Sequence, residues 1–153
     1  MKIAEFLKPE SVISELSSST KPDVLKELSS SLSKSNPSVP LLKLAAVLEE
    51  RERLGSTGIG EGVAIPHGKL AGLTNLSASF GVSRSGIDFE AIDGKRTHLF
   101  FALVAPENSA GLHLKALARI SRLFKNSSFR EAILAAKNSE EIYSLIARED
   151  AKT

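Results

Sequence analysis

The stretch Leu99 to Val104, with the sequence LFFALV, decides the fold class of this chain. It is a continuous apolar run between Thr97 and Pro106. A strand that faces water on one side alternates apolar and polar residues, whereas a strand covered on both faces is apolar throughout. The run therefore predicts a central strand buried between two layers.

Helical segments are expected before this strand. The first has Pro22 in its opening turn and an apolar stripe made of Leu25, Leu28 and Leu32. A second helix is expected from Pro40 to Arg53, because apolar residues again fall on one face and Gly55 follows as a C-terminal glycine.

Strands and further helices complete the pattern. Strands are expected over 11–16 and 77–83, the latter ending before a turn at Ser85-Gly86. Three helices follow the central strand, over roughly 110–125, from Ser128 with a capping box to Glu131, and from Asn138 or Ser139. Helices at both ends of the chain with strands between them predict an α/β fold of three layers, with helices on both faces of the sheet.

Composition limits the classes of function. A chain of 153 residues fits a single domain over 1–153, and a net charge of +2 gives no argument for nucleic acid as a partner. Without cysteine, disulfides and zinc–thiolate sites are excluded. We find no signal peptide and no apolar run of transmembrane length, so we expect a cytoplasmic protein with no direct membrane insertion.

The segment Gly55 to Lys69, GSTGIGEGVAIPHGK, holds the chemistry. Four glycines precede His67, which lies between Pro66 and Gly68. Proline restricts the backbone before the histidine, and we expect Gly68 to leave room beside it for a docking protein. Imidazole has a pKa of about 6.5, so most of it is neutral at pH 7 and has a lone pair that can attack phosphorus. We therefore interpret His67 as an acceptor of a phosphoryl group.

The spacing of the glycines and histidines excludes nucleotide-binding and metal-binding motifs in this segment. Gly58 to Gly62 reads GxGxG after a helix, not GxGxxG after a strand, and Gly68-Lys69 is followed by leucine where a P-loop needs serine or threonine. The three histidines do not form a metal-binding spacing. We expect neither a metal nor a cofactor.

Arg51 continues the inward face of the second helix and can offer a fork of donors to a phosphate. A salt bridge at the rim remains the alternative for this residue. Arg53 is better explained as a surface partner of Glu49, one turn earlier.

His113 is expected in the first turn of the helix over 110–125, on the face that packs inward. A helix N-terminus disfavours imidazolium, so a neutral His113 can donate to a phosphate or orient His67. A core histidine with one satisfied nitrogen is the alternative. For His98 we expect only a hydrogen bond to a neighbouring residue.

The segment over 55–69 resembles the active-site segment of phosphotransferase-system (PTS) IIA proteins of the fructose/mannitol type, most of all their nitrogen-regulatory branch. The similarity extends to segments at 48–53, 91–93, 99–106 and 112–114. It implies a mixed β-sheet between helices, His67 as the phosphorylated residue, and His113 and Arg51 as its active-site partners. Ser56 and Thr57 are implied as further phosphate-binding residues.

The resemblance also implies partners. The phosphoryl donor is a small histidine-phosphorylated carrier protein (NPr- or HPr-like), and regulatory targets include a potassium transporter or a sensor kinase. Ile59, Val63 and Ile65 are candidates for an apolar docking surface around the histidine. The alternatives are a sugar-transport IIA component that passes phosphate to a IIB domain, and a pure interaction module without phosphoryl transfer.

Overall fold

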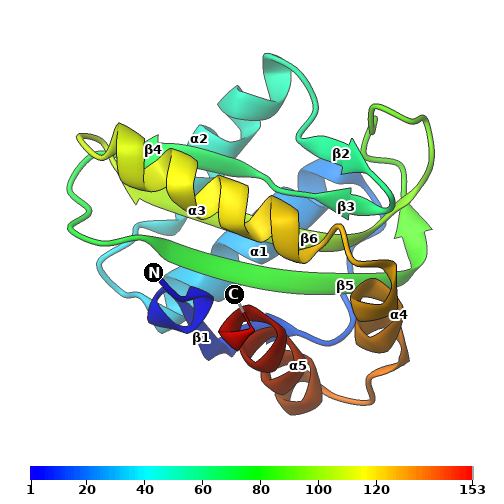
Figure 1. Ribbon diagram of the computed structural model, residues 1–153. Helices are drawn as coiled ribbons and strands as arrows, with labels where there is room; N and C mark the ends of the chain where they lie inside the picture. Colours follow the sequence, from blue (N-terminus) through cyan, green and yellow to red (C-terminus); the bar gives the residue numbers. More distant parts are fainter. Residues whose placement is uncertain (153) are drawn as a thin grey trace.

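The computed structural model describes residues 1–152 and is built around one six-stranded sheet (Figure 1). The strands follow the spatial order β1-β5-β6-β3-β2, and β4 also pairs with β6. After a short 3-10 turn at Ile3–Glu5, their bounds are β1 Leu7–Ile13, β2 Gly58–Gly60, β3 Val63–Ala64, β4 His67–Leu70, β5 Ser77–Ile87 and β6 Thr97–Pro106.

Helices cover both faces of this sheet. On one face, α1 (Lys21–Ser35) and α2 (Leu41–Arg53) bury a leucine-rich core; on the other lie α3 (Ala110–Leu123), α4 (Ser127–Ala135) and α5 (Ser139–Ala151) over a phenylalanine-containing core. The predicted three-layer α/β/α class is thereby confirmed. No helix described over 1–152 combines the length and hydropathy that crossing a bilayer requires.

Strand β6 is the central strand that the apolar run predicts. Leu99, Phe101 and Leu103 belong to the core beneath α3–α5, whereas Phe100 and Ala102 belong to the core beneath α1 and α2. β6 pairs antiparallel with β5 and parallel with β3 and β4, so the sheet is mixed. Each side chain from Leu99 to Val104 thus enters one of two cores, which is why the run has no polar position.

The glycine-rich segment is more regular than expected. We predicted a loop, and instead β2 and β3 lie within it and β4 begins in it, with His67 as the first residue of β4. The turn between β2 and β3 needs its glycines, because Gly60, Glu61 and Gly62 have φ of 90°, 59° and 76°. The histidine is therefore anchored to the sheet rather than carried on a free loop.

Other element boundaries shift where the sequence carries competing signals. β1 lies over Leu7–Ile13 rather than 11–16, and β5 passes through the expected turn at Ser85-Gly86 with an irregular register. The predicted capping box at Ser128 is wrong. Asn126 caps α4 instead, and its side chain accepts a bond from the Phe129 N–H.

Candidate functional site

His67 is oriented by the residues just before it. Its Nδ1 atom lies 2.6 Å from the carbonyl oxygen of Ile65. A carbonyl oxygen can only accept a hydrogen bond, so Nδ1 carries the proton and Nε2 has the free lone pair. The neighbouring Pro66 carbonyl accepts from the Leu103 N–H of β6 at 2.9 Å, which holds this turn on the sheet. The ring itself is half-buried.

Directly after His67, β4 approaches α2 so closely that only glycine fits. A Cβ atom on Gly68 would overlap Cγ1 of Val47. The space that we expected a docking protein to use is therefore taken by α2. Gly68 fixes the distance between the strand that carries the histidine and the helix that carries Arg51.

His113 approaches His67 from α3, on the opposite face of the sheet from α2. The two ring centroids are 5.5 Å apart and the ring planes meet at 74°. His113 is 6% exposed, and within residues 1–152 its Nε2 atom has no hydrogen-bond partner. Burial, with the charges of His67 and Lys69, lowers the pKa of His113 to about 4. The ring is therefore neutral at pH 7 and brings an uncommitted nitrogen next to His67.

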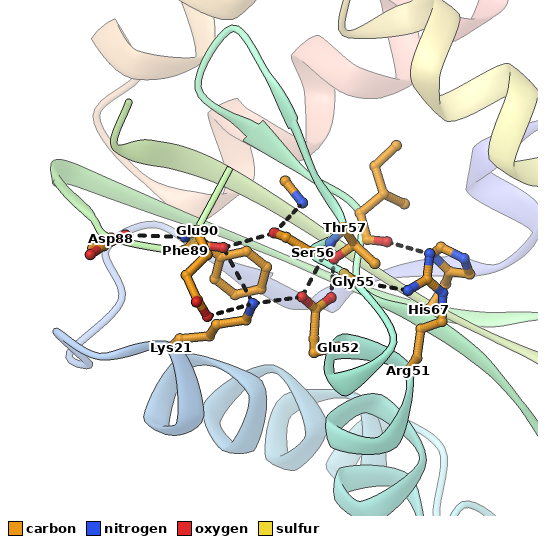
Figure 2. A network of polar contacts seen from close by, with 12 residues as sticks. Lys21, Arg51, Glu52, Gly55, Ser56, Thr57, His67, Asp88, Phe89 and Glu90 are labelled. Atoms are coloured by element: carbon orange, nitrogen blue, oxygen red, sulfur yellow. Dashed lines mark hydrogen bonds and ion pairs between the residues drawn. The ribbon is translucent and has the colours of Figure 1, made fainter. Parts of the chain in front are cut away.

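Arg51 approaches from the last turn of α2. One guanidinium nitrogen, Nη1, donates to the Gly55 carbonyl at 2.8 Å, and no carboxylate of the described chain pairs with this side chain. Figure 2 shows the guanidinium beside the His67 ring. The rim salt bridge that was the alternative for Arg51 is absent over 1–152. Arg53 does pair at the surface, but with Glu50 at 3.0 Å instead of the expected Glu49.

These surroundings keep His67 neutral. Burial has the largest effect and lowers the pKa of His67, whereas the hydrogen bond to Ile65 raises it. The positive charge of Arg51 also lowers this pKa, and the negative charge of Glu52 raises it. The net direction is below the ordinary value of 6.5. A neutral, tautomer-fixed imidazole next to a cation can act as a nucleophile toward an anionic group.

Ser56 and Thr57, the two predicted phosphate-binding residues, have hydroxyl groups that are already committed. The Ser56 hydroxyl donates to the Phe89 carbonyl at 2.8 Å, and the Thr57 hydroxyl donates to the Glu52 carboxylate. Thr57 is also buried at 3% exposure. In this structure both hydroxyls therefore stabilise the segment beside the histidine, and a contact of either with phosphate stays a prediction.

The expected apolar surround of the histidine is partly wrong. Ile59 is 41% exposed, but Val63 and Ile65 are 2% and 4% exposed and belong to the core beneath α3–α5. His98 makes the hydrogen bond to a neighbouring residue that we expected of it. Its Nδ1 atom lies 2.9 Å from the Ser83 carbonyl of the neighbouring strand.

A largely buried ion pair behind the site was not predicted from the sequence. Glu52 is 9% exposed, and its Oε1 atom lies 2.9 Å from Nζ of Lys21 at the start of α1 (Figure 2). The helical spacing does place Glu52 on the inward face of α2, because Glu52 follows Leu48 by one turn. A carboxylate on that face needs a cation, which periodicity alone does not supply.

Comparison with known proteins places this geometry in a family. The family model for "Phosphoenolpyruvate-dependent sugar phosphotransferase system, EIIA 2" matches residues 5–149. A nitrogen regulatory protein of Bradyrhizobium diazoefficiens is 37% identical over 147 residues, which cover 96% of this chain and 95% of that protein. A fructose-specific EIIABC component of the PTS of Bacillus subtilis is 35% identical over 150 residues, 98% of this chain but 24% of that protein.

Solved structures agree with the sequence comparison. The crystal structure of nitrogen regulatory protein IIA-Ntr from Neisseria meningitidis superimposes with a TM-score of 0.86 at 33% identity, over 94% of this chain and 98% of that one. IIA mannitol from Escherichia coli has the same fold at 20% identity, with a TM-score of 0.76. A family match over residues 5–149, relatives that align along nearly the whole chain and a shared fold lead to one conclusion: the chain belongs to the EIIA type 2 family of the phosphoenolpyruvate-dependent sugar phosphotransferase system.

Proposed function

We propose that this protein is a regulatory phosphocarrier of the nitrogen phosphotransferase system, and that residues 1–153 act as a single EIIA domain in the cytoplasm. It accepts a phosphoryl group on Nε2 of His67 from a histidine-phosphorylated carrier protein. The observation that carries this proposal is the 2.6 Å hydrogen bond from Nδ1 to the Ile65 carbonyl, since it leaves Nε2 as the nucleophile. The nitrogen-regulatory branch is supported by relatives of that name that match the chain over most of their own length.

The transfer needs no external proton. The Nε2 lone pair of His67 forms a bond to phosphorus while the N–P bond in the carrier breaks, and the electron pair of that bond returns to the carrier's imidazole. Positive charge develops on the His67 ring, which keeps its proton on Nδ1. The Ile65 carbonyl, already accepting that N–H, stabilises the charge.

The groups around the ring match the charge of the transferred group. Arg51 donates to Gly55 through Nη1, which leaves other guanidinium N–H groups for phosphoryl oxygens. His113 has an uncommitted Nε2 atom in the first turn of α3, where the helix dipole favours an anion. In this role His113 and Arg51 stabilise the phosphoryl group, and His67 alone accepts it.

Phosphorylation would change what the protein binds. It adds negative charge at His67, in the segment that also carries the exposed apolar residue Ile59. A target such as a potassium transporter or a sensor kinase that docks on the unphosphorylated surface would then be repelled. This supports a role in which the phosphorylation state selects the target.

The test is a phosphorylation assay with phosphoenolpyruvate, the first enzyme of the phosphotransferase system and a carrier protein. We expect one acid-labile, base-stable phosphate, with the P–N bond assigned to Nε2 by NMR. His67→Ala should abolish the label, whereas the matched control His98→Ala should keep it. Labelling that persists in His67→Ala contradicts the proposal.

A second function has its own support. The relative from Bacillus subtilis named as a fructose-specific component is 35% identical over 150 residues, so a IIA component that passes phosphate to a IIB domain is the alternative. The same assay separates the two. Faster transfer from the nitrogen-branch carrier, with no onward transfer to fructose- or mannitol-type IIB domains, supports the regulator; onward transfer to a IIB domain supports the sugar component.

A further inference from the structure

Glu52 holds the turn between α2 and β2 with both of its carboxylate oxygens. Oε1 accepts from the Thr57 N–H at 3.1 Å, and Oε2 accepts from the Thr57 hydroxyl. Lys21 neutralises the carboxylate at 2.9 Å and also lies over the Phe89 ring, 4.6 Å from its centroid (Figure 2). Glu52 thus has a partly buried cation on one side and the segment 55–57 on the other.

Two backbone carbonyls of the segment 55–57 connect this carboxylate to the site. The Gly55 carbonyl accepts from the Arg51 guanidinium at 2.8 Å. The Thr57 carbonyl accepts from the Ile65 N–H at 3.0 Å, and Ile65 in turn accepts from Nδ1 of His67. A single carboxylate therefore holds a three-residue segment on which both the arginine and the histidine depend.

We infer that Glu52 is a positioning residue: it fixes the segment 55–57 so that the active arginine and histidine keep their orientation. The inference assigns the role of Glu52 within the proposed function and rests on it. The carboxylate itself lies behind the reacting atoms and does not touch the phosphoryl group. Its effect is on where the Gly55 and Thr57 carbonyls point.

Phe89 gives the segment a second support. Its carbonyl accepts from the Ser56 hydroxyl at 2.8 Å and from Nζ of Lys21 at 3.3 Å. The cation that neutralises Glu52 therefore also binds the residue that holds Ser56. The support of the site thus reaches from α1 to the strand-end segment at 88–90, and none of it depends on a bound phosphate.

The first test reads the His67 tautomer in the unphosphorylated protein at neutral pH, from long-range proton–nitrogen NMR correlations. Wild type should show Nδ1–H with a free Nε2. Glu52→Gln removes the charge, and Thr57→Val removes the hydroxyl at nearly constant shape; both should give a mixture of tautomers. Thr57→Ser retains the hydroxyl and should match wild type.

The second test is the rate of phosphoryl transfer from the carrier. We expect Glu52→Gln to slow it about 10-fold and Thr57→Val several-fold, because a small misplacement of reacting groups is costly. Thr57→Ser should stay within about twofold of wild type. The matched control is Asp150→Asn in α5, another buried carboxylate, 2% exposed and 2.6 Å from Arg119, which should leave tautomer and rate unchanged.

The outcomes separate cleanly. If folded Glu52→Gln and Thr57→Val both keep the Nδ1–H tautomer and the wild-type rate, Glu52 does not position the site. The inference is equally overturned if Thr57→Ser behaves like Thr57→Val, or if Asp150→Asn reproduces the loss. If Glu52→Gln fails to fold, the threonine pair decides. A wild type that takes no phosphate defeats the proposed function instead, and the tautomer measurement still tests the hydrogen-bond chain.

Discussion

The imidazole rings of His67 and His113 meet edge to face, with their centroids 5.5 Å apart. His67 belongs to strand β4 of the sheet, and His113 belongs to helix α3 in the layer that covers it. At this distance a positive charge on one ring disfavours a positive charge on the other. The charge of His67 accordingly helps to lower the pKa of His113, and a neutral His113 suits a donor to an anion.

Replacing His113 should slow phosphoryl transfer without removing the residue that accepts the phosphate. In His113→Ala, His67 and its lone pair remain, so the protein should still take one phosphate, but about 100-fold more slowly because a preorganised donor is lost. His113→Gln retains an N–H donor of similar reach and should recover part of the rate. Single-turnover transfer from the phosphorylated carrier measures both variants. A His113→Ala rate equal to wild type would leave His113 as a core residue only.

The low pKa of His113 predicts a loss of stability in acid. The folded protein keeps His113 neutral down to about pH 4, whereas in the unfolded chain it titrates near 6.5. Between these values the unfolded state binds more protons, so the free energy of unfolding should fall as the pH decreases, by up to roughly 3 kcal/mol.

The matching measurement compares urea unfolding at about pH 7 and about pH 5. His113→Gln removes the titrating group and should show a smaller loss between the two values than wild type. An equal loss in both proteins would mean that other groups dominate the acid sensitivity.

The sequence predicted the layers of the fold because they depend on periodicity. The uninterrupted run over 99–104 implied two covered faces, and the leucine stripes of the flanking helices supplied the cover. The strands inside the glycine-rich segment were missed. β2 and β3 are only three and two residues long, and they form because β3 pairs with β6 and β2 pairs with β3, which local alternation does not reveal.

The site was predictable only in part. His67 could be proposed from its neighbours along the chain, whereas the helix faces of Arg51 and His113 left structural alternatives open, and only the family resemblance favoured them as site residues. The partners of Ser56 and Thr57 could not be predicted, because Phe89 is distant in the sequence and Glu52 reaches Thr57 only through the geometry of the turn after α2. The missed ion pair of Lys21 and Glu52 has the same cause, since its members lie on different helices.

Gly68→Ala should push β4 away from α2. The added methyl group would overlap Val47 Cγ1, and overpacking of this kind costs about 1–3 kcal/mol of stability. The shift also moves His67, so transfer should slow. Thermal unfolding and the transfer assay measure the two effects.

The control for Gly68→Ala is a second substitution at Val47, the residue that the added methyl group would overlap. Val47→Ala in the same chain removes the clashing methyl, so the double variant should regain both stability and rate relative to Gly68→Ala. Gly111→Ala adds a methyl group where nothing lies within 4 Å, and its stability should not fall. If the double variant is no better than Gly68→Ala, the strand–helix distance is not what glycine protects.

Two arginines two residues apart on α2 offer a direct contrast. Arg51→Lys keeps a positive charge but loses the fork that can bond Gly55 and a phosphoryl oxygen together, so transfer should slow by about 10-fold or more, and Arg51→Ala further still. Arg53 has a side chain 69% exposed and pairs with Glu50, so Arg53→Ala should leave the rate within about twofold of wild type. Rapid-quench transfer from the carrier compares the three variants. Equal losses at both positions would show that the assay senses only the net charge of the helix end, whereas a loss confined to position 51 would show that the guanidinium acts where its geometry places it, beside the His67 ring.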